Sequence, residues 1–167
     1  MCSSDLEFDT VFAFGLFHNF EMTEIPEVLA EARRVLKPGG VLCFSFRADN
    51  LQNLLVDILA SWRQRHRTGT LTFHKLNCTE SEIRDLTIRA GFSAAIVERE
   101  ENVPLLYRFR PFRHPEQRTT AERDARSEGW RLSRSATVLT WILRHLAPGQ
   151  FHSLHVVVAT RDVQQRT

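Results

Sequence analysis

Residues Phe14–Phe20 (FGLFHNF) are the segment of this sequence best placed to carry chemistry. They follow directly from the apolar run Val11–Phe14, which is typical of a strand, and parallel sheets bind ligands at the carboxyl ends of their strands. His18 lies in this segment and can act as a general base, because an imidazole titrates near neutral pH. The structural alternative is that His18 only packs or forms hydrogen bonds, and that its apolar neighbours belong to the core.

A second candidate is Tyr107–His114 (YRFRPFRH), which alternates aromatic side chains with arginines. Such mixtures can stack on bases and pair with phosphates. Acidic residues follow soon after this segment and dilute its charge, which argues against a nucleic-acid partner. We expect either an arginine-coated insert whose aromatic side chains dock on the domain, or a lid that recognises an anionic or lipid-like substrate.

His152 and His155 are close enough in the sequence to suggest a metal site. In a strand, however, residues three apart point to opposite faces, so these two imidazoles cannot converge on one ion. We expect both to flank a strand as solvent or hairpin residues. No other group of His, Cys, Asp and Glu has the spacing of metal ligands, so the sequence predicts no metal.

The candidate loop is followed by a helix and a second strand. Val11–Phe14 is a short apolar run, the pattern of a strand covered on both faces. Apolar residues at three- and four-residue steps then define one face of a helix: Ile25, Val28, Leu29, Ala32 and Leu36. Pro38 and Gly39–Gly40 should end this helix, and Val41–Phe46 is the next strand. A strand, crossover helix and strand of this length predicts a parallel βαβ unit.

At these residues the chain resembles the class I S-adenosylmethionine-dependent methyltransferases. The family has an Asp-Xaa-Val strand like Phe8–Val11 (FDTV), a loop like Gly15–Phe20, and a helix ending in a stop like Leu36–Gly40 (LKPGG). The resemblance continues from Thr79 to Phe92. It implies an α/β fold, namely a partial Rossmann-like methyltransferase sheet with parallel strands plus a C-terminal antiparallel strand, flanked by helices.

The resemblance also implies a function and a site. The function is transfer of a methyl group from the cofactor S-adenosylmethionine to a small-molecule or lipid-like acceptor. In the family the loop after this strand lines the methionine end of the cofactor and the acceptor pocket. This assigns cofactor binding to Phe14, Gly15, Leu16 and Phe17, and substrate binding to His18. No residue is assigned as catalytic, because methyl transfer to a good nucleophile needs mainly alignment and desolvation.

One further helix and strand have clear local signals. Thr79 is a plausible N-cap and Glu82 stands at the reciprocal position of a capping box. We therefore expect a helix over Glu80–Ala90 that ends at Gly91. Ala94–Glu98 should be the strand that follows it.

The spacing of apolar residues predicts the remaining helices and strands. Leu51–Trp62 predicts a helix, and Arg63–Gly69 a basic loop after it. Leu154–Thr160 predicts the last strand, which by the resemblance lies antiparallel between the two strands before it. The expected spatial order is therefore first, second, last, third. An insert over Glu101–Gln150 precedes this strand and holds a helix at Thr137–Leu146.

The residues before Phe8 leave no room for the first half of such a domain. There the family has a glycine-rich loop and an acidic residue that binds the ribose, whereas this sequence has seven glycines and no Gly-Xaa-Gly. Met1–Leu6 (MCSSDL) resembles the translated end of a sequencing-library adapter. We expect residues 1–6 to be a non-native tag and residues 7–167 a truncated methyltransferase domain with an insert at 101–150. A native, loosely ordered N-terminus is the alternative.

Composition limits the class of protein. The chain has 167 residues, of which 43% are hydrophobic, and this excludes a disordered chain. No apolar stretch reaches the roughly 20 residues that span a bilayer. Three cysteines form no disulfide or zinc framework, so a reducing cytoplasm is the expected compartment. The net charge of +2 is too small to indicate a polyanionic partner.

Two function classes follow from these observations. The first is a small-molecule methyltransferase, present here as a fragment that lacks the glycine-rich cofactor loop. The second is a non-catalytic Rossmann-like binding domain or a fragment of a nicotinamide-dependent oxidoreductase. Tyr107 is the only tyrosine and has no lysine four residues later, unlike many nicotinamide-dependent reductases, which favours the first class.

Overall fold

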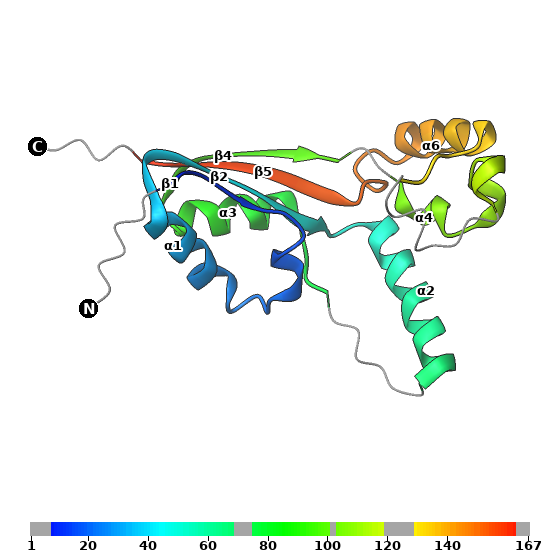
Figure 1. Ribbon diagram of the computed structural model, residues 1–167, viewed down its shortest axis with the longest axis horizontal. Coiled ribbons are helices and arrows are strands. Elements are labelled where there is room, and N and C mark those ends of the chain that lie inside the picture. Colours follow the sequence, from blue (N-terminus) through cyan, green and yellow to red (C-terminus); the bar gives the residue numbers. More distant parts are fainter. Residues whose placement is uncertain (1–7, 69–74, 101–102, 119–128, 163–167) are drawn as a thin grey trace, which may run out of the picture. The chain divides into compact units, whose positions relative to one another are not determined.

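The computed structural model describes residues 8–68, 75–100, 103–118 and 129–162 (Figure 1). Its contacts divide the chain into two compact units. Unit 1 consists of Met1–Asp49, Thr72–Glu100 and Leu154–Thr167, and unit 2 of Asn50–Leu71 and Glu101–Ser153. Unit 1 contains the sheet, and unit 2 is helical.

Unit 1 is built on a mixed five-stranded sheet with the order β1-β2-β5-β4. These strands are β1 (Phe8–Ala13), β2 (Leu36–Ala48), β5 (Leu154–Arg161) and β4 (Phe92–Arg99), and the short β3 (Asn77–Cys78) pairs with β2. β1 is parallel to β2, whereas β5 is antiparallel to both of its neighbours. The predicted strand order and the antiparallel last strand are therefore confirmed.

Two helices cover one face of this sheet, α1 (Ile25–Val35) and α3 (Glu80–Arg89) (Figure 1). The apolar residues predicted for α1 lie on the covered side, and Ile25 and Leu29 are fully buried. The core between helices and sheet consists of Phe17, Ile25, Leu29, Leu36, Leu42, Phe44, Phe46, Cys78, Ile83, Phe92, Val157 and Ala159. Alternate residues of the strands point into this core, as expected for a period of two.

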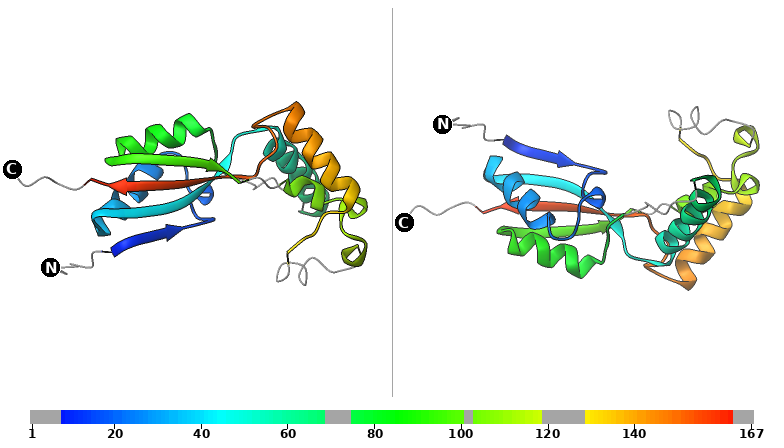
Figure 2. Two further views of the ribbon diagram at one scale, coloured as in Figure 1. Left: turned by 90° about the horizontal axis from the view of Figure 1, so that it is seen from above. Right: turned by 90° about the horizontal axis from the view of Figure 1, so that it is seen from below.

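The opposite face of the sheet carries no helix of unit 1, as the view from above shows (Figure 2). By register, the row Phe12, Cys43, Val158 and Ile96 crosses the four main strands on this face. Phe12 is 69% exposed and Ile96 is 59% exposed. The prediction of a strand covered on both faces was thus wrong for β1, because β1 lies at the sheet edge and only one face is packed against helices.

The Lys-Pro-Gly-Gly segment lies beyond the end of α1. The helix ends at Val35, since Leu36 is already extended, and residues 37–40 form the start of β2. Gly39 has a φ of 78°. A Cβ at Gly40 would come within 2.8 Å of the carbonyl oxygen of Lys37. The glycines therefore allow a tight entry into the strand, and they do not form the helix cap that the sequence predicted.

The N-terminus of α3 agrees with its prediction in detail. The backbone N–H of Glu82 donates to Thr79 Oγ1 at 3.3 Å, and the backbone N–H of Thr79 donates to Glu82 Oε2 at 2.8 Å. Gly91, at the other end, has a φ of 87°. The capping box and the glycine stop are thus both confirmed.

Unit 2 contains α2 (Leu51–Thr68), the short α4 (Pro104–Tyr107) and α6 (Arg134–Leu146), together with the 3-10 helices η2 (Arg110–Phe112) and η3 (Pro115–Gln117). Its buried apolar cluster consists of Val103, Leu106 and Ala136, and Val56 of α2 is also buried. The predicted basic loop was wrong over residues 63–68, which continue α2, because arginine and glutamine are good helix formers. Residue 69 lies outside the described part.

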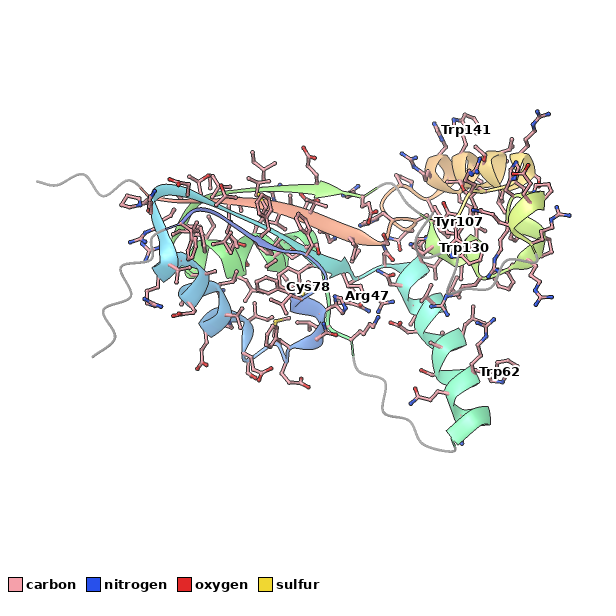
Figure 3. The ribbon with its side chains drawn as sticks, viewed as in Figure 1. Arg47, Trp62, Cys78, Tyr107, Trp130 and Trp141 are labelled. Atoms are coloured by element: carbon pink, nitrogen blue, oxygen red, sulfur yellow. The ribbon has the colours of Figure 1, made fainter. Side chains whose placement is uncertain are left out.

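The apolar faces of α2 and α6 are largely exposed to solvent. On α2, Trp62 is 60% exposed, whereas Gln52 and Asn53 are buried. On α6, Trp141 is 61% exposed, and its side chain projects away from the unit (Figure 3). Neither of these helices, nor any other helix among the described residues, is long and apolar enough to cross a membrane.

Candidate functional site

The carboxyl ends of β1, β2 and β3, which run parallel to one another, meet at one edge of the sheet. β1 leads into the loop at Phe14–Phe20, which contains the 3-10 helix η1 (Phe17–Asn19). β2 ends at Ala48 and pairs there with Cys78 of β3. This is the edge at which doubly wound sheets bind ligands, so the predicted loop lies where a site is expected.

Gly15 is held in a conformation that favours glycine. Its φ is 67°, and its backbone N–H donates to Ser45 Oγ at 3.0 Å. Ser45 is 1% exposed, so this hydrogen bond fixes the loop to a rigid position on β2. A Cβ added at Gly15 would meet no atom within 4 Å. The space beside Gly15 is therefore open, and a ligand can approach its backbone.

The three apolar residues of the predicted cofactor site lie in different environments. Phe14 is 57% exposed and Leu16 is 43% exposed, so their side chains lie at the surface beside Gly15. Phe17 is 1% exposed, and its ring centroid lies 5.0 Å from that of Phe44 and 5.1 Å from that of Phe46. The side chain of Phe17 thus packs in the core, and any ligand contact of this residue would come through its backbone.

His18 lies beside two cations. Burial, Lys75 and Arg47 together lower the pKa of His18 below its ordinary value of 6.5. Its backbone oxygen accepts a hydrogen bond from the N–H of Leu76 at 3.0 Å, which connects the loop to the segment before β3. Its Nδ1 is buried and has no hydrogen-bond partner among the described residues. His18 is therefore neutral at pH 7 and able to accept a proton.

Arg47 provides the fixed positive charge of this edge (Figure 3). It is 7% exposed, and its Nη1 donates to Asn77 Oδ1 at 2.9 Å. Arg47, Asn77 and Ser45 were missed in the sequence because nothing in their local pattern marks them. The signal that could have found them is their position at the carboxyl ends of strands parallel to β1.

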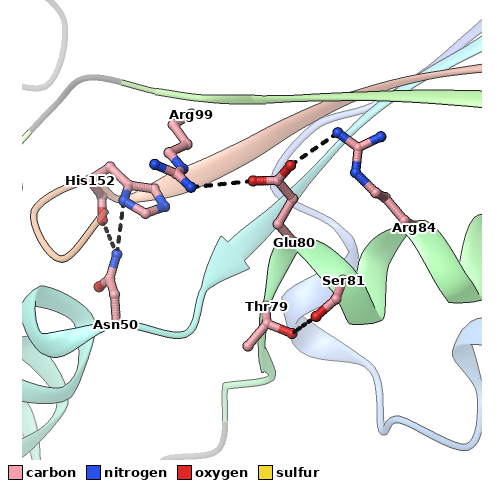
Figure 4. Close-up of polar contacts among 7 residues, drawn as sticks. All are labelled: Asn50, Thr79, Glu80, Ser81, Arg84, Arg99 and His152. Atoms are coloured by element: carbon pink, nitrogen blue, oxygen red, sulfur yellow. Dashed lines mark hydrogen bonds and ion pairs between the residues drawn. The ribbon is translucent and has the colours of Figure 1, made fainter. Parts of the chain in front are cut away.

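Cys78 and the two C-terminal histidines do not add reactive groups to this edge. Burial, with help from Glu82 and Asp49, raises the pKa of the Cys78 thiol to about 12, so it stays protonated. We expected both histidines to flank the strand as solvent or hairpin residues. Both are instead buried, at 5% and 4% exposure, and His155 lies within β5, whereas His152 precedes it. Asn50 Nδ2 donates to the His152 oxygen at 2.8 Å within unit 2 (Figure 4).

The charged residues near the start of α3 form structural ion pairs. Glu80 accepts from Arg84 at 3.0 Å and from Arg99 at 3.4 Å (Figure 4). The hydrogen bond from Arg84, together with the positive charges of Arg84 and Arg99, lowers the pKa of the Glu80 carboxyl. The described part of the chain contains no group of three His, Cys, Asp or Glu residues that could hold a metal ion.

The segment that contains β1, the loop and α1 is similar to a known protein family. Residues 3–44 match the family model described as a methyltransferase domain. This match covers β1, the loop, α1 and the larger part of β2. This segment is thus similar to the corresponding part of a methyltransferase domain. A search of curated protein sequences gives no match.

Solved structures of methyltransferases share the fold. They include phosphoethanolamine N-methyltransferase 2 of Haemonchus contortus in complex with S-adenosyl-L-methionine (18% identity, TM-score 0.51). A methyltransferase of Archaeoglobus fulgidus (13%, 0.52) and one of Methanosarcina mazei (16%, 0.52) are similar to the same degree. The alignments cover 93%, 94% and 98% of this chain, but only 33%, 61% and 64% of those methyltransferases. The chain thus spans less than two thirds of each of them.

Proposed function

We propose that the intact protein transfers a methyl group from S-adenosylmethionine to a small-molecule or lipid-like acceptor. The observation that carries this proposal is the loop after β1, where Gly15 has a φ of 67° beside open space at the carboxyl edge of a methyltransferase sheet. The Haemonchus contortus protein, an N-methyltransferase of phosphoethanolamine by its name, supports a small polar acceptor.

The residues of this loop fit one end of the cofactor. S-adenosylmethionine supplies an electrophilic methyl group on a sulfonium centre. The open backbone at Gly15 would contact its methionine end, and the exposed side chains of Phe14 and Leu16 would exclude water from the reacting atoms. Phe17 would hold the loop in place through its packing against Phe44.

His18 would position the acceptor and receive its proton. A neutral imidazole can accept a proton from an acceptor hydroxyl or ammonium group, and the lowered pKa keeps it neutral. The nearby Arg47 and Lys75 favour an acceptor that carries negative charge or that develops it on losing its proton. Alignment by these groups would supply most of the rate, so loss of His18 should reduce activity without abolishing it.

We further propose that the rest of the cofactor site lies in a segment that precedes Phe8 in the intact protein. The chain covers a third to two thirds of the methyltransferases it resembles, and β1 is an uncovered edge. In the resembled family a glycine-rich loop and an acidic residue upstream of this strand hold the nucleoside. This chain alone should therefore bind S-adenosylmethionine only weakly.

The test is to identify the genomic sequence upstream of Phe8 and to express the extended protein. Calorimetry with S-adenosylhomocysteine should give micromolar affinity for the extended protein, and at least tenfold weaker affinity for its Gly15→Val variant. Gly129→Val is the matched control, because Gly129 also has a positive φ and open space but lies in unit 2. Micromolar affinity of the 167-residue chain alone would contradict the proposed missing segment.

The role of His18 has its own measurement. We expect His18→Gln to lower kcat by about tenfold to a hundredfold, as for loss of a general base in an aligned site. The acidic limb of the pH–rate profile should lie below pH 6.5 in the parent protein and disappear in the variant. An unchanged profile would assign His18 a packing role only.

A further inference from the structure

A cavity of about 200 Å³ lies within unit 2, apart from the loop that carries the proposed methyl transfer. It is lined by Arg63, Pro104, Tyr107, Arg108, Arg113 and Trp130. We propose that this cavity binds a small phosphorylated molecule, with the phosphate held by arginines and the organic part against the aromatic side chains. This proposal rests on unit 2 alone and does not depend on the proposed methyl transfer.

Arg113 is held in a fixed orientation by two contacts. Its Nε donates to the backbone oxygen of Tyr107 at 2.6 Å, and its guanidinium carbon lies 3.9 Å from the ring centroid of Trp130. Tyr107 and Trp130, which are labelled in Figure 3, line the same cavity. Since these contacts use Nε and one face of the guanidinium, its two terminal nitrogens can form the paired hydrogen bonds that phosphate accepts.

The charges around the cavity match a dianion. The described lining residues include three arginines and no acidic side chain. Unit 2 as a whole also has an excess of positive side chains, because residues 50–71 and 101–153 contain twelve arginines and six acidic residues. A phosphate monoester carries close to two negative charges at neutral pH, so it matches this cluster better than a carboxylate with a single charge does.

The other lining groups select for a small ligand with an apolar part. Burial raises the pKa of the Tyr107 phenol, so its hydroxyl stays protonated and can donate to an anion. Pro104 and the Trp130 ring supply apolar surface beside the arginines. The volume accommodates a phosphate and a few further atoms, which separates this site from a surface groove that follows a nucleic-acid backbone.

The test uses the full chain and three probes, which are phenyl phosphate, inorganic phosphate and benzoate. The chain has three tryptophans, so a background with Trp62→Phe and Trp141→Phe leaves Trp130 as the single tryptophan, whose fluorescence is excited selectively over that of Tyr107. We expect saturable quenching by phenyl phosphate, weaker binding of inorganic phosphate, and the weakest binding of benzoate. Tighter binding of inorganic phosphate than of phenyl phosphate would overturn the organic subsite.

Variants decide whether the cavity is the site. Arg113→Gln and Arg113→Lys should each weaken phenyl phosphate binding by about tenfold or more, since lysine cannot form the bidentate pair. Arg63→Gln removes an exposed side chain of α2, so it tests the same cavity without disturbing the fold, and it should weaken binding by about threefold to tenfold. Circular dichroism checks that each variant folds.

The control is Arg134→Gln, which removes one exposed arginine of α6 that does not line the cavity. This variant should change the affinity by less than about twofold. Equal losses in Arg134→Gln and Arg63→Gln would show diffuse attraction to a basic surface and overturn the proposal. So would tighter binding of a single-stranded oligonucleotide that all of these variants weaken alike, or no saturable binding of phenyl phosphate.

Discussion

The two units use amphipathic segments in opposite ways. In unit 1 the apolar residues between the helices and the sheet are buried, and Phe44, Phe46 and Leu29 have no exposed surface. In unit 2 the periodic residues of α2 and α6 face solvent, and Leu146 is 79% exposed. The charges differ as well. By sequence, unit 1 has fourteen acidic and ten basic residues, whereas unit 2 has six acidic and twelve basic ones.

This difference shows what apolar spacing does and does not determine. A period of three to four residues makes a helix with one apolar face, and both units contain such helices. Whether that face is buried depends on an opposing surface. In unit 1 the sheet provides one for α1 and α3, while the small buried cluster of unit 2 leaves most of α2 and α6 exposed.

The largest expected difference between the units is in the free energy of unfolding that each loses when one large side chain is removed. Phe44→Ala should lower the free energy of unfolding by about 3–5 kcal/mol, because Phe44 is fully buried against Phe17 and Phe46. Trp141→Ala should change it by less than about 0.5 kcal/mol, because that ring is exposed. Urea titration followed by circular dichroism measures both. Similar losses would mean that α6 packs as tightly as the sheet.

A second contrast concerns self-association. β1 is an edge strand, and its segment Val11–Phe14 contains no charged residue or proline that would prevent pairing with another chain. Phe12 on this strand is 69% exposed, so we expect the chain to associate through β1 and the uncovered sheet face. Phe12→Lys should raise the concentration at which the chain associates by about tenfold or more. Trp141→Lys is the matched change on α6, and sedimentation velocity compares the two. A larger effect of Trp141→Lys would locate the association on unit 2.

A third pair of variants compares the backbone strain at one glycine of each unit. Gly15 and Gly129 have φ angles of 67° and 75°, and neither would bring a Cβ within 4 Å of another atom. Alanine at either position should cost about 1–2 kcal/mol of stability, because both would hold a side chain in the left-handed region. Thermal unfolding of both variants tests this. A stability loss confined to one of them would mean that its neighbouring loop adjusts.

The smallest expected effect is at the helix caps. Thr79→Ala should cost about 1 kcal/mol at pH 7, and Ser133→Ala, at the N-cap of α6, a similar or smaller amount. The backbone and side chain of Thr79 lower the pKa of Glu82 below its ordinary 4.5. The folded state thus favours the carboxylate, and this stability is present above pH 4.5 and lost as the pH falls through the lowered value.

The two caps should therefore respond differently to acid. The cost of Thr79→Ala should shrink between pH 7 and pH 3, whereas that of Ser133→Ala should stay constant, since Ser133 has no acidic partner in its cap. Urea titrations at the two pH values give both costs. A cost of Thr79→Ala that does not depend on pH would show that Glu82 contributes nothing through its charge.

The sequence predicted those elements whose signals are local. The capping box at Thr79 and the strands around Phe44 and Val157 needed only short patterns. The antiparallel order of the last strand came from the resemblance to methyltransferases, because spacing alone does not tell which strand lies between which. The apolar spacing did not predict the extension of α2 beyond Trp62, because arginines replace apolar residues there, although arginine favours helix.

The candidate site was predicted in part for a related reason. The sequence indicated Gly15 and His18 because they follow a strand directly. Ser45, Arg47 and Lys75 lie about 30 to 60 residues further along the chain, and only strand pairing brings them to the same edge. The sequence could not predict the burial of Phe17 either, because a phenylalanine in a loop can face a ligand or the core.

The position of β5 has a consequence for how the chain is made. Among the described residues, β4 pairs with no strand other than β5, and β5 also completes the pairing of β2. On a ribosome, the residues up to Ser153 would emerge before either pairing could form, so the sheet of unit 1 would stay open while the segment Glu101–Ser153 of unit 2 is synthesised. Nascent β4 would present unpaired backbone throughout that interval, and chaperones that shield extended apolar segments would have their main opportunity to bind there.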